Sequence, residues 1–253
     1  MEQTTPLSST VKPNWTRADR WIYRLSKNWL LIFGVIFGTW IGLPFLPPFF
    51  MAMGRDSLAK AIYLLYSFQC HQLPQRSFFF FSSKGMYSLN EIQAVWQDTT
   101  NPLILRQFVG TPELGWKVAW SDRMVYMYTS ILVFGGLWWL FRRKIKPLPW
   151  WGLLILLLPM AVDGTSHMIS DLAGIGMGFR DNNVWLAALT NNTFSPEFYA
   201  GDAFGSFNSW MRLLTGVLFG LGIVWFGFPY LNKSFSDLVK VMQNKLRRSQ
   251  TDL

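Results

Sequence analysis

The most regular feature of the chain is a series of long apolar runs separated by polar and basic segments. The first run, residues 29–53, contains no charged residue. Further runs occupy residues 124–141 and 209–230, and another begins at 149–162. About 20 consecutive apolar residues are needed for a helix to cross the hydrocarbon core of a bilayer. The pattern therefore predicts about four transmembrane helices.

A fifth apolar run, residues 60–70, is shorter than the others. At about 1.5 Å of rise per residue it is too short to cross a bilayer. We interpret it as a re-entrant or interfacial helix. The alternative is a full span that continues to Phe78–Phe81, but this span would bury Cys70, His71 and Arg76 in the membrane.

These runs divide the chain into three parts. Residues 1–28 form a polar and basic segment, residues 29–231 a single helical membrane domain, and residues 232–253 a basic tail. Within the membrane domain, the polar segments 82–121 and 170–206 predict sizeable loops outside the membrane, on the extracytoplasmic side. The predicted fold is an all-α membrane protein with about four transmembrane helices and one short re-entrant or interfacial helix.

The first 28 residues have a pattern of their own. Residues 1–14 are rich in Ser and Thr and predict disorder. Residues 15–28 interleave four basic side chains with aromatic ones. This mixture is typical of an amphipathic helix on a membrane surface, although a solvated helical lead-in to the first span has the same pattern.

Glycines recur at helical spacing in two of the predicted spans. Gly34, Gly38 and Gly42 lie on one helix face, and Gly216 and Gly220 form a second pair. Small residues at this spacing let a neighbouring helix approach closely. We therefore expect helix packing at these faces, with other membrane subunits as one class of partner and membrane lipids as the other.

Composition agrees with a membrane protein. Hydrophobic residues make up 51% of the chain and charged residues 15%, against about 25% charged residues in soluble domains. The net charge of +9 would also suit a nucleic-acid-binding protein. The basic residues stand beside the apolar runs, however, which is typical of cytoplasmic loops, so we expect no nucleic-acid partner.

The distribution of charge predicts the orientation. With both termini and the turn 142–149 on one side, that side holds 14 Lys and Arg and 4 Asp and Glu, whereas the other side holds 9 and 10. Basic loops stay in the cytoplasm. We therefore expect a multi-pass protein of the plasma membrane with both termini cytoplasmic and an even number of crossings.

Several polar side chains would meet at the outer membrane face in this topology. Asp163 and His167 are four residues apart and share a helix face. Together with Cys70, His71 and Asp122 they offer sulfur, imidazole and carboxylate ligands, which suit one divalent transition metal such as zinc. The sequence therefore predicts a candidate metal site of these five residues.

The alternative is a structural polar cluster without a metal. Buried charges in membrane proteins usually pair with one another. Asp122 or Asp163 would then pair with Arg123 or Arg212, and His167 would bond a carboxylate. Cys70 is the single cysteine of the chain, so an intramolecular disulfide is excluded and an inert buried thiol is the expected state.

The stretch from Cys70 to Phe78 reads Cys-His-Gln-Leu-Pro-Gln-Arg-Ser-Phe. It resembles the Cys-His-x-x-Pro-x-Arg-Ser/Thr-Phe signature of an uncharacterised prokaryotic integral membrane protein family that is catalogued as a domain of unknown function. Further stretches match this family in the same order, namely Pro159 with Asp163-Gly164, residues 178–183, and Met211-Arg212 with Thr215-Gly216. The resemblance covers about residues 65–225 and implies a shared architecture.

One motif of this family is missing. Where the family has Cys-Ala-Arg-Cys at the start of a helix, this chain has Ala119-Trp120-Ser121-Asp122. A thiolate-rich site, if the family has one, cannot be intact here, although Asp122 could still be an oxygen ligand. The resemblance implies no activity.

Two functions follow from these observations. The first is a metal-dependent, lipid-directed membrane enzyme, in which the metal activates water or a phosphoryl oxygen and Arg180 or Arg212 binds an anionic group. The second is a non-catalytic structural or assembly subunit of a membrane complex. A transporter ranks third, because the chain shows no convincing internal repeat of the kind such folds contain.

Overall fold

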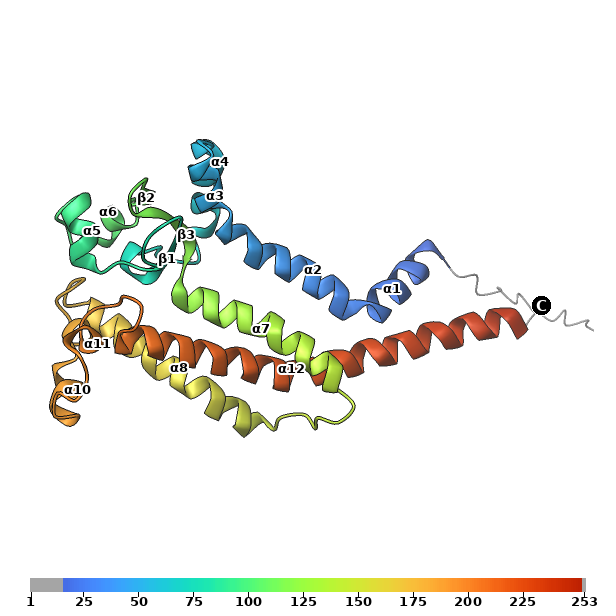
Figure 1. Cartoon of the computed structure of the whole chain (residues 1–253). Helices are drawn as coiled ribbons and strands as arrows, with labels where there is room; N and C mark the ends of the chain where they lie inside the picture. Colours follow the sequence, from blue (N-terminus) through green and yellow to red (C-terminus); the bar gives the residue numbers. More distant parts are fainter. Residues whose placement is uncertain (1–15, 252–253) are drawn as a thin grey trace, which may run out of the picture. The chain divides into compact units, whose positions relative to one another are not determined.

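The computed structural model describes residues 16–251, which are mainly helical (Figure 1). The helices are α1 (Arg17–Lys27), α2 (Trp29–Gly42), α3 (Pro47–Ala52), α4 (Asp56–Tyr66), α5 (Leu89–Val95), α6 (Pro102–Leu105), α7 (Asp122–Phe141), α8 (Trp150–Asp171), α9 (Phe179–Asn182), α10 (Val184–Leu189), α11 (Pro196–Tyr199) and α12 (Phe207–Thr251). The strands are β1 (Ser77–Phe80), β2 (Gly110–Thr111) and β3 (Gly115–Ser121), and short 3₁₀ helices occupy Leu43–Phe45 and Pro74–Arg76.

The chain forms two compact units. One unit comprises residues 36–228, and the other combines the chain before residue 36 with the chain after residue 228. Within residues 16–251, three helices are long and apolar enough to cross a membrane, namely α7, α8 and α12. The number rises to four if α1 and the 29–45 segment, which are bent by 75° relative to each other, count as one broken span. The predicted number of four spans is the upper of these two values.

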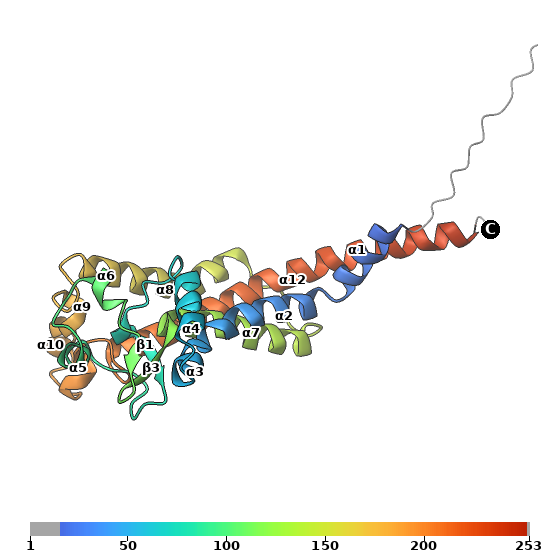
Figure 2. The same cartoon turned by 90° about the horizontal axis from the view of Figure 1, so that it is seen from above.

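The larger unit is built on α7, α8 and the first part of α12, which run side by side (Figures 1 and 2). Gly216 and Gly220 lie where α12 meets α7. A Cβ atom at Gly216 would lie 2.9 Å from the Cβ of Tyr126, and one at Gly220 would collide with the Ser130 hydroxyl. The predicted close packing at this glycine pair is therefore confirmed.

The glycines of α2 behave differently. A Cβ atom at Gly38 would only touch Leu132, at 3.9 Å, and one at Gly34 or Gly42 would meet nothing within 4 Å in the part of the chain that the structure describes. The predicted close helix contact at this stripe is thus not made at Gly34 or Gly42 within a single chain.

The segment predicted as an outer loop, 82–121, contains regular structure. Strands β2 and β3 lie in it together with α5 and α6, and β1 and β2 both pair antiparallel with β3 to give the sheet order β1-β3-β2. Val118, Ala119 and Trp120 in β3 are all fully buried. Because both faces of this strand are covered, the alternation of apolar and polar residues that reveals a strand is absent. The all-α prediction missed the sheet for this reason.

The sheet also settles the interpretation of residues 60–81. Helix α4 ends at Tyr66, and Phe78 to Phe80 belong to β1, so the alternative of one long span through this region is wrong. Phe79 of this strand is buried, with its ring centroid 5.1 Å from that of Tyr87.

We call residues 43–121 and 172–206 together the cap. Its elements gather around the ends of the three long helices at which α7 and α12 begin and α8 ends (Figures 1 and 2). One core of the cap forms where α4 packs on β3. The rings of Tyr66 and Trp120 meet edge to face at 5.3 Å, and the Tyr63 hydroxyl donates to the carbonyl of Lys117. The predicted loop 170–206 likewise carries three short helices, α9 to α11.

The smaller unit contains α1, the start of α2 and the last part of α12. Thr16 and Asp19 form a capping box at the start of α1, and Lys245 donates to both oxygens of Asp19 at 2.8 Å. The ring of Trp29 stacks on that of Phe235 at 5.5 Å. The predicted basic tail is thus a continuation of α12, and the helix predicted at 15–28 is present. The predicted disorder of residues 1–14 lies outside the described residues.

A buried arginine–aspartate network as the candidate functional site

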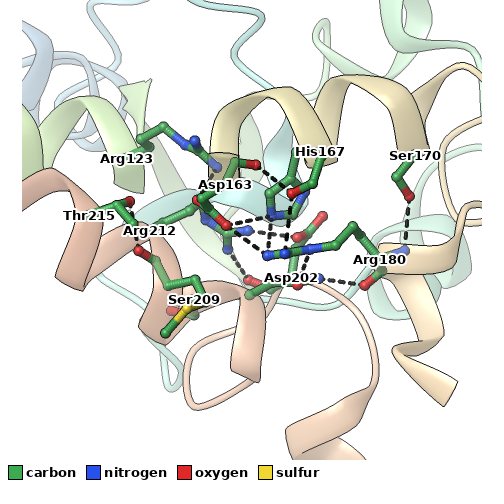
Figure 3. A network of polar contacts seen from close by, with 12 residues as sticks. Arg123, Asp163, His167, Ser170, Arg180, Asp202, Ser209, Arg212 and Thr215 are labelled. Carbon is green, nitrogen blue, oxygen red and sulfur yellow. Dashed lines mark hydrogen bonds and ion pairs between the residues drawn. The ribbon is translucent and has the colours of Figure 1, made fainter. Parts of the chain in front are cut away.

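Buried and partly buried charged side chains of the cap and of the long helices collect where α7 and α12 begin and α8 ends. Four arginines and four aspartates form this cluster, which we call the network: Arg76, Arg123, Arg180, Arg212, Asp122, Asp163, Asp171 and Asp202. Figure 3 shows most of them converging from separate elements. The formal charges of these eight side chains cancel.

Arg212 lies in the first turns of α12, and each of its three guanidinium nitrogens donates a hydrogen bond. Its Nε donates to Asp122 Oδ2 at 2.8 Å, and its two terminal nitrogens donate to Asp202 Oδ1 and to the Asp202 carbonyl, both at 2.6 Å. Arg212 and Asp122 are almost completely inaccessible to solvent. An anionic ligand, which was the predicted partner of Arg212, would have to reach a buried guanidinium whose three nitrogens already donate within the protein.

Asp202, in the loop before α12, joins this arginine to a second one. Arg76 Nε donates to Asp202 Oδ2 at 2.6 Å, and its terminal nitrogens bind both oxygens of Asp171 at 2.7 and 2.8 Å. Burial alone would raise the pKa of Asp202, but the guanidinium groups of Arg76 and Arg212 hold this pKa below its usual range. Asp202 is therefore a carboxylate shared by two cations.

Arg180, in α9, is the third buried cation. Its Nη2 donates to Asp163 Oδ1 at 2.7 Å, and its Nε donates to Asn208 Oδ1 at 3.1 Å. The amides of Asn183 and Asn208 both donate to the Arg180 carbonyl. Arg180 is thus held on both its side chain and its backbone, and the anion-binding role predicted for it stays a prediction.

His167 stands one helical turn after Asp163, as predicted. Its Nε2 lies 3.2 Å from Arg180 Nη2. An arginine only donates, so Nε2 must accept, and the proton of the neutral ring is then on Nδ1. The Nδ1 atom is buried and has no hydrogen-bond partner in the described structure. His167 Nε2 also lies 3.9 Å from Asp163 Oδ1, so the predicted hydrogen bond of this ring to a carboxylate is replaced by the bond from Arg180.

Arg123, at the start of α7, is the most exposed arginine of the network. Its Nη2 lies 2.7 Å from Asp163 Oδ2, and its Nη1 reaches only the thioether sulfur of Met160, at 3.7 Å. Asp163 is therefore shared by Arg123 and Arg180 in the same way as Asp202 is shared by its two arginines. The pairs of Asp163 with Arg123 and of Asp122 with Arg212 are those predicted for a structural cluster.

The predicted metal site is not supported by this geometry. Within residues 16–251, no group of three or more His, Cys, Asp or Glu side chains is placed to hold a metal ion. Asp122 and Asp163 are bound by arginines. His71 is exposed, and the Cys70 thiol accepts from the backbone N–H groups of Gln72 and Ser121 at 3.4 and 3.3 Å. The five residues of the candidate metal site therefore lie in different local environments.

Three members of the network were missed by sequence reasoning. Arg76 was noticed only as a polar residue of a motif, and Asp171 and Asp202 were assigned to a loop. The segments around these three residues have no periodic pattern that would mark them as buried. A second missed residue type is a buried lysine. Lys117 in β3 donates to the carbonyls of Gln72 and Arg106 at 2.8 and 2.7 Å.

The structure also brings two of the sequence motifs together. The Cys70 thiol, which opens the Cys-His motif, lies against the N–H of Ser121, within the stretch 119–122. Gln72 donates to the Ala119 carbonyl at 3.0 Å. The two stretches, about 50 residues apart in the sequence, are therefore direct neighbours at the base of α7.

This chain is similar to a family of predicted membrane proteins. The family model described as "Predicted membrane protein (DUF2085)" matches residues 113–226, which include β3, α7, α8 and the start of α12. An uncharacterized protein of Methanocaldococcus jannaschii is 31% identical over 152 residues, which are 56% of this chain and 75% of that relative. The chain belongs to this family of predicted membrane proteins. No solved structure gives a significant match.

The matched segment contains seven of the eight network residues, and only Arg76 precedes it. The family description supports a protein with several apolar helices and assigns no reaction.

Proposed function

We propose that the protein is a non-catalytic structural or assembly subunit of a membrane complex, in which the network locks the cap onto the long helices. The observation that carries this proposal is that the arginines and aspartates of the network pair with one another. Each of the four aspartates accepts from an arginine, and Arg76, Arg180 and Arg212 each bind two or more acceptors. A catalytic or ligand-binding cluster needs groups that are free to take a substrate.

The cost of burying charge supports a fixed network. An unpaired ion in a low-dielectric interior costs several kcal/mol, and removing one partner of a buried pair typically costs about 3–5 kcal/mol. Because two aspartates each bind two arginines, no pair can open without leaving a buried charge. The network therefore favours one relative position of Arg76 and Asp202 in the cap and of Asp122 and Arg212 at the helix ends.

Surfaces for a partner lie along the long helices instead. Two apolar grooves follow the contact of α7 with α12. The first is lined by residues that include Val125, Thr129, Val133 and Val217. The second is lined by residues that include Leu137, Phe141, Leu221 and Val224. In α2, Gly42 leaves open space beside the backbone. Surfaces of this kind suit lipid chains or a closely packed helix of another subunit.

The orientation belongs to the same proposal. The basic turn after α7 and the basic end of α12 would lie in the cytoplasm with both termini, and the cap would then lie outside the plasma membrane. The division into residues 1–28, 29–231 and 232–253 is the matching domain organisation. Helix α4, which has 11 residues, would lie at the outer interface.

A metal-dependent enzyme is the second candidate. One observation favours it, namely the buried Nδ1 atom of His167, which lacks a partner. A metal at this nitrogen would need further ligands, and the neighbouring carboxylate, Asp163, is held by two arginines. The enzyme therefore ranks below the structural subunit.

The proposal is tested by the composition of the particle in its native membrane. The protein is extracted from its host with its surrounding lipid in a styrene–maleic acid copolymer, and intact particles are weighed by native mass spectrometry. We expect a stable particle that contains a second polypeptide or a second copy of the chain. Elemental analysis of the same particles is expected to show no stoichiometric transition metal.

Two variants of α2 serve as a matched pair. Gly42→Leu fills the open face, whereas Ile36→Leu changes an exposed residue on another face of the same helix. Loss of the larger particle in Gly42→Leu alone would identify the glycine face as the contact. A monodisperse monomer for the unmodified chain, or bound zinc that disappears in His167→Ala, would overturn the structural-subunit proposal.

A further inference from the structure

Helix α1 carries an apolar surface that the rest of the structure leaves uncovered. Trp21, Ile22 and Leu25 are 64%, 38% and 46% exposed. At 100° per residue these positions fall on one side of the helix. A flank of the helix, about a quarter turn from this apolar side, contains Asp19 and Ser26, which are buried, and Asp19 is bound by Lys245 of α12. The ion pair with α12 is therefore made from this flank, and the apolar side of α1 stays exposed among the described residues.

The same helix exposes four basic side chains, Arg17, Arg20, Arg24 and Lys27. Within residues 16–251, none of the three arginines has an acidic partner. Arg17 and Arg24 lie about a quarter turn from the centre of the apolar side. Long basic side chains at this border can keep their apolar stems in the interface and their charges at the level of the headgroups.

The geometry around α1 fits a helix that lies in a membrane plane. Helix α1 is bent by 75° relative to the 29–45 segment that follows it. If that segment enters the bilayer close to its normal, α1 runs nearly along the surface. The ion pair of Asp19 with Lys245 and the stacking of Trp29 on Phe235 hold this bend from the side of α12.

We propose that α1 is a binding site for anionic phospholipids, with its apolar side in the interfacial layer and its arginines on the lipid phosphates. Two properties of the helix select this occupant. The uncompensated positive charge is complementary to an anionic lipid surface, and an aromatic and aliphatic side flanked by arginine is the pattern of interfacial helices. The proposal goes beyond the structural-subunit function and uses none of its residues.

The test measures where α1 lies in the full-length protein. A nitroxide label is placed at Leu25→Cys on the apolar side or at Lys27→Cys on the opposite side. Each labelled protein is reconstituted in nanodiscs of phosphatidylcholine with about 30% phosphatidylglycerol. The anionic lipid gives the surface the negative potential that attracts basic segments. The native Cys70 is buried, and the unmodified protein controls for labelling at this position. Collisions with oxygen and with a water-soluble nickel chelate report lipid and water contact.

We expect the label at position 25 to meet oxygen and to be shielded from nickel, and the label at position 27 to show the reverse. In R17Q/R20Q/R24Q, the ratio of shielded to water-exposed label at position 25 should fall by about fivefold for each charge removed. Nanodiscs of phosphatidylcholine alone should lower the ratio in the same direction.

Three results would overturn the proposal. Equal nickel access at positions 25 and 27 would show a solvated helix. Shielding from both reagents would show that protein covers the apolar side. A ratio at position 25 that does not change in R17Q/R20Q/R24Q or in neutral lipid would show that anionic headgroups are not recognised. An unchanged unfolding temperature of the triple variant confirms that it is folded, and none of these results bears on the composition of the native particle.

Discussion

Arginine has opposite environments in the network and in α1. Arg76, Arg180 and Arg212 are largely buried and bind carboxylates at 2.6–2.8 Å. Arg17 and Arg20 of α1 are exposed and have no carboxylate partner in the described part of the chain. The residue type is the same, but the first group is fixed by the fold and the second is available to a ligand.

The comparison shows that charge alone does not indicate a binding site. A buried arginine is stabilised only when acceptors surround it, and those acceptors then exclude a ligand. An exposed arginine contributes little to folding and keeps its donors for an external partner. Substitutions should therefore change stability in the network and lipid contact in α1.

The largest effect is expected from Asp202→Asn. This change removes the shared carboxylate and leaves Arg76 and Arg212 buried with uncompensated charge, so we expect a loss of about 3–5 kcal/mol in the free energy of unfolding. Tryptophan fluorescence during denaturation in detergent measures the change. The matched control is Asp237→Asn, which breaks an exposed pair with Lys240 and should cost about 0.5 kcal/mol or less. Equal stability of the two variants would contradict a fixed network.

A smaller loss is expected from Arg212→Lys. The charge is kept, but a single ammonium group cannot replace the fork that binds Asp122 and Asp202 together. We expect a loss of about 2 kcal/mol, since at least one charge-assisted hydrogen bond disappears. Arg24→Lys in α1 should leave the unfolding midpoint unchanged. If Arg212→Lys also left it unchanged, the bidentate contacts would not matter.

Lys117 is an intermediate case, because it is buried and has no carboxylate partner among the described residues. Burial lowers its pKa to about 7 in the folded protein, against about 10.4 for an unperturbed lysine. Below pH 7 Lys117 is protonated in both the folded and the unfolded protein, and burial of its charge then destabilises the folded state in full. Above this pH Lys117 loses its proton in the folded protein but keeps it in the unfolded protein. The free energy of unfolding should therefore rise by about 1.4 kcal/mol per pH unit up to about pH 10.

This contribution is measured by comparing unfolding of the wild type and Lys117→Met at pH 7 and at about pH 9. The wild type should gain stability relative to the variant as the pH rises. A parallel pH dependence of the two proteins would show that Lys117 does not titrate in this window.

The smallest effect on folding is expected from R17Q/R20Q/R24Q. Because these arginines have no carboxylate partner in residues 16–251, the free energy of unfolding should change by no more than about 0.5 kcal/mol. Thermal unfolding in detergent without anionic lipid checks this value. A loss comparable to that of Asp202→Asn would remove the distinction between the two groups of arginines.

Much of the architecture could be predicted from the sequence. The apolar runs locate α7, α8 and the apolar part of α12, and the spacing of Gly216 and Gly220 predicts the close approach of α12 to α7. The rule that buried membrane charges pair was enough to predict the contacts of Asp122 and Asp163 with arginines. These are local patterns, each readable from its own segment.

No three residues of the candidate metal site come together within residues 16–251. Cys70, His71, Asp122, Asp163 and His167 have suitable chemistry, but chemistry does not show which acceptor meets which donor. Asp202 and Arg76 come from segments with no periodic signal, and the distance of 126 positions between them is not readable from either segment.

The sequence by itself determined the class of protein, the long helices, the basic segments and the amphipathic character of α1. These properties depend on hydrophobicity and on neighbours three or four positions away. The tertiary structure decided the small sheet, the burial of Phe79 and Lys117, and the partners of each arginine. The reason is physical, because burial and charge pairing depend on which distant segments meet, and only folding of the cap over the ends of α7, α8 and α12 brings those segments together.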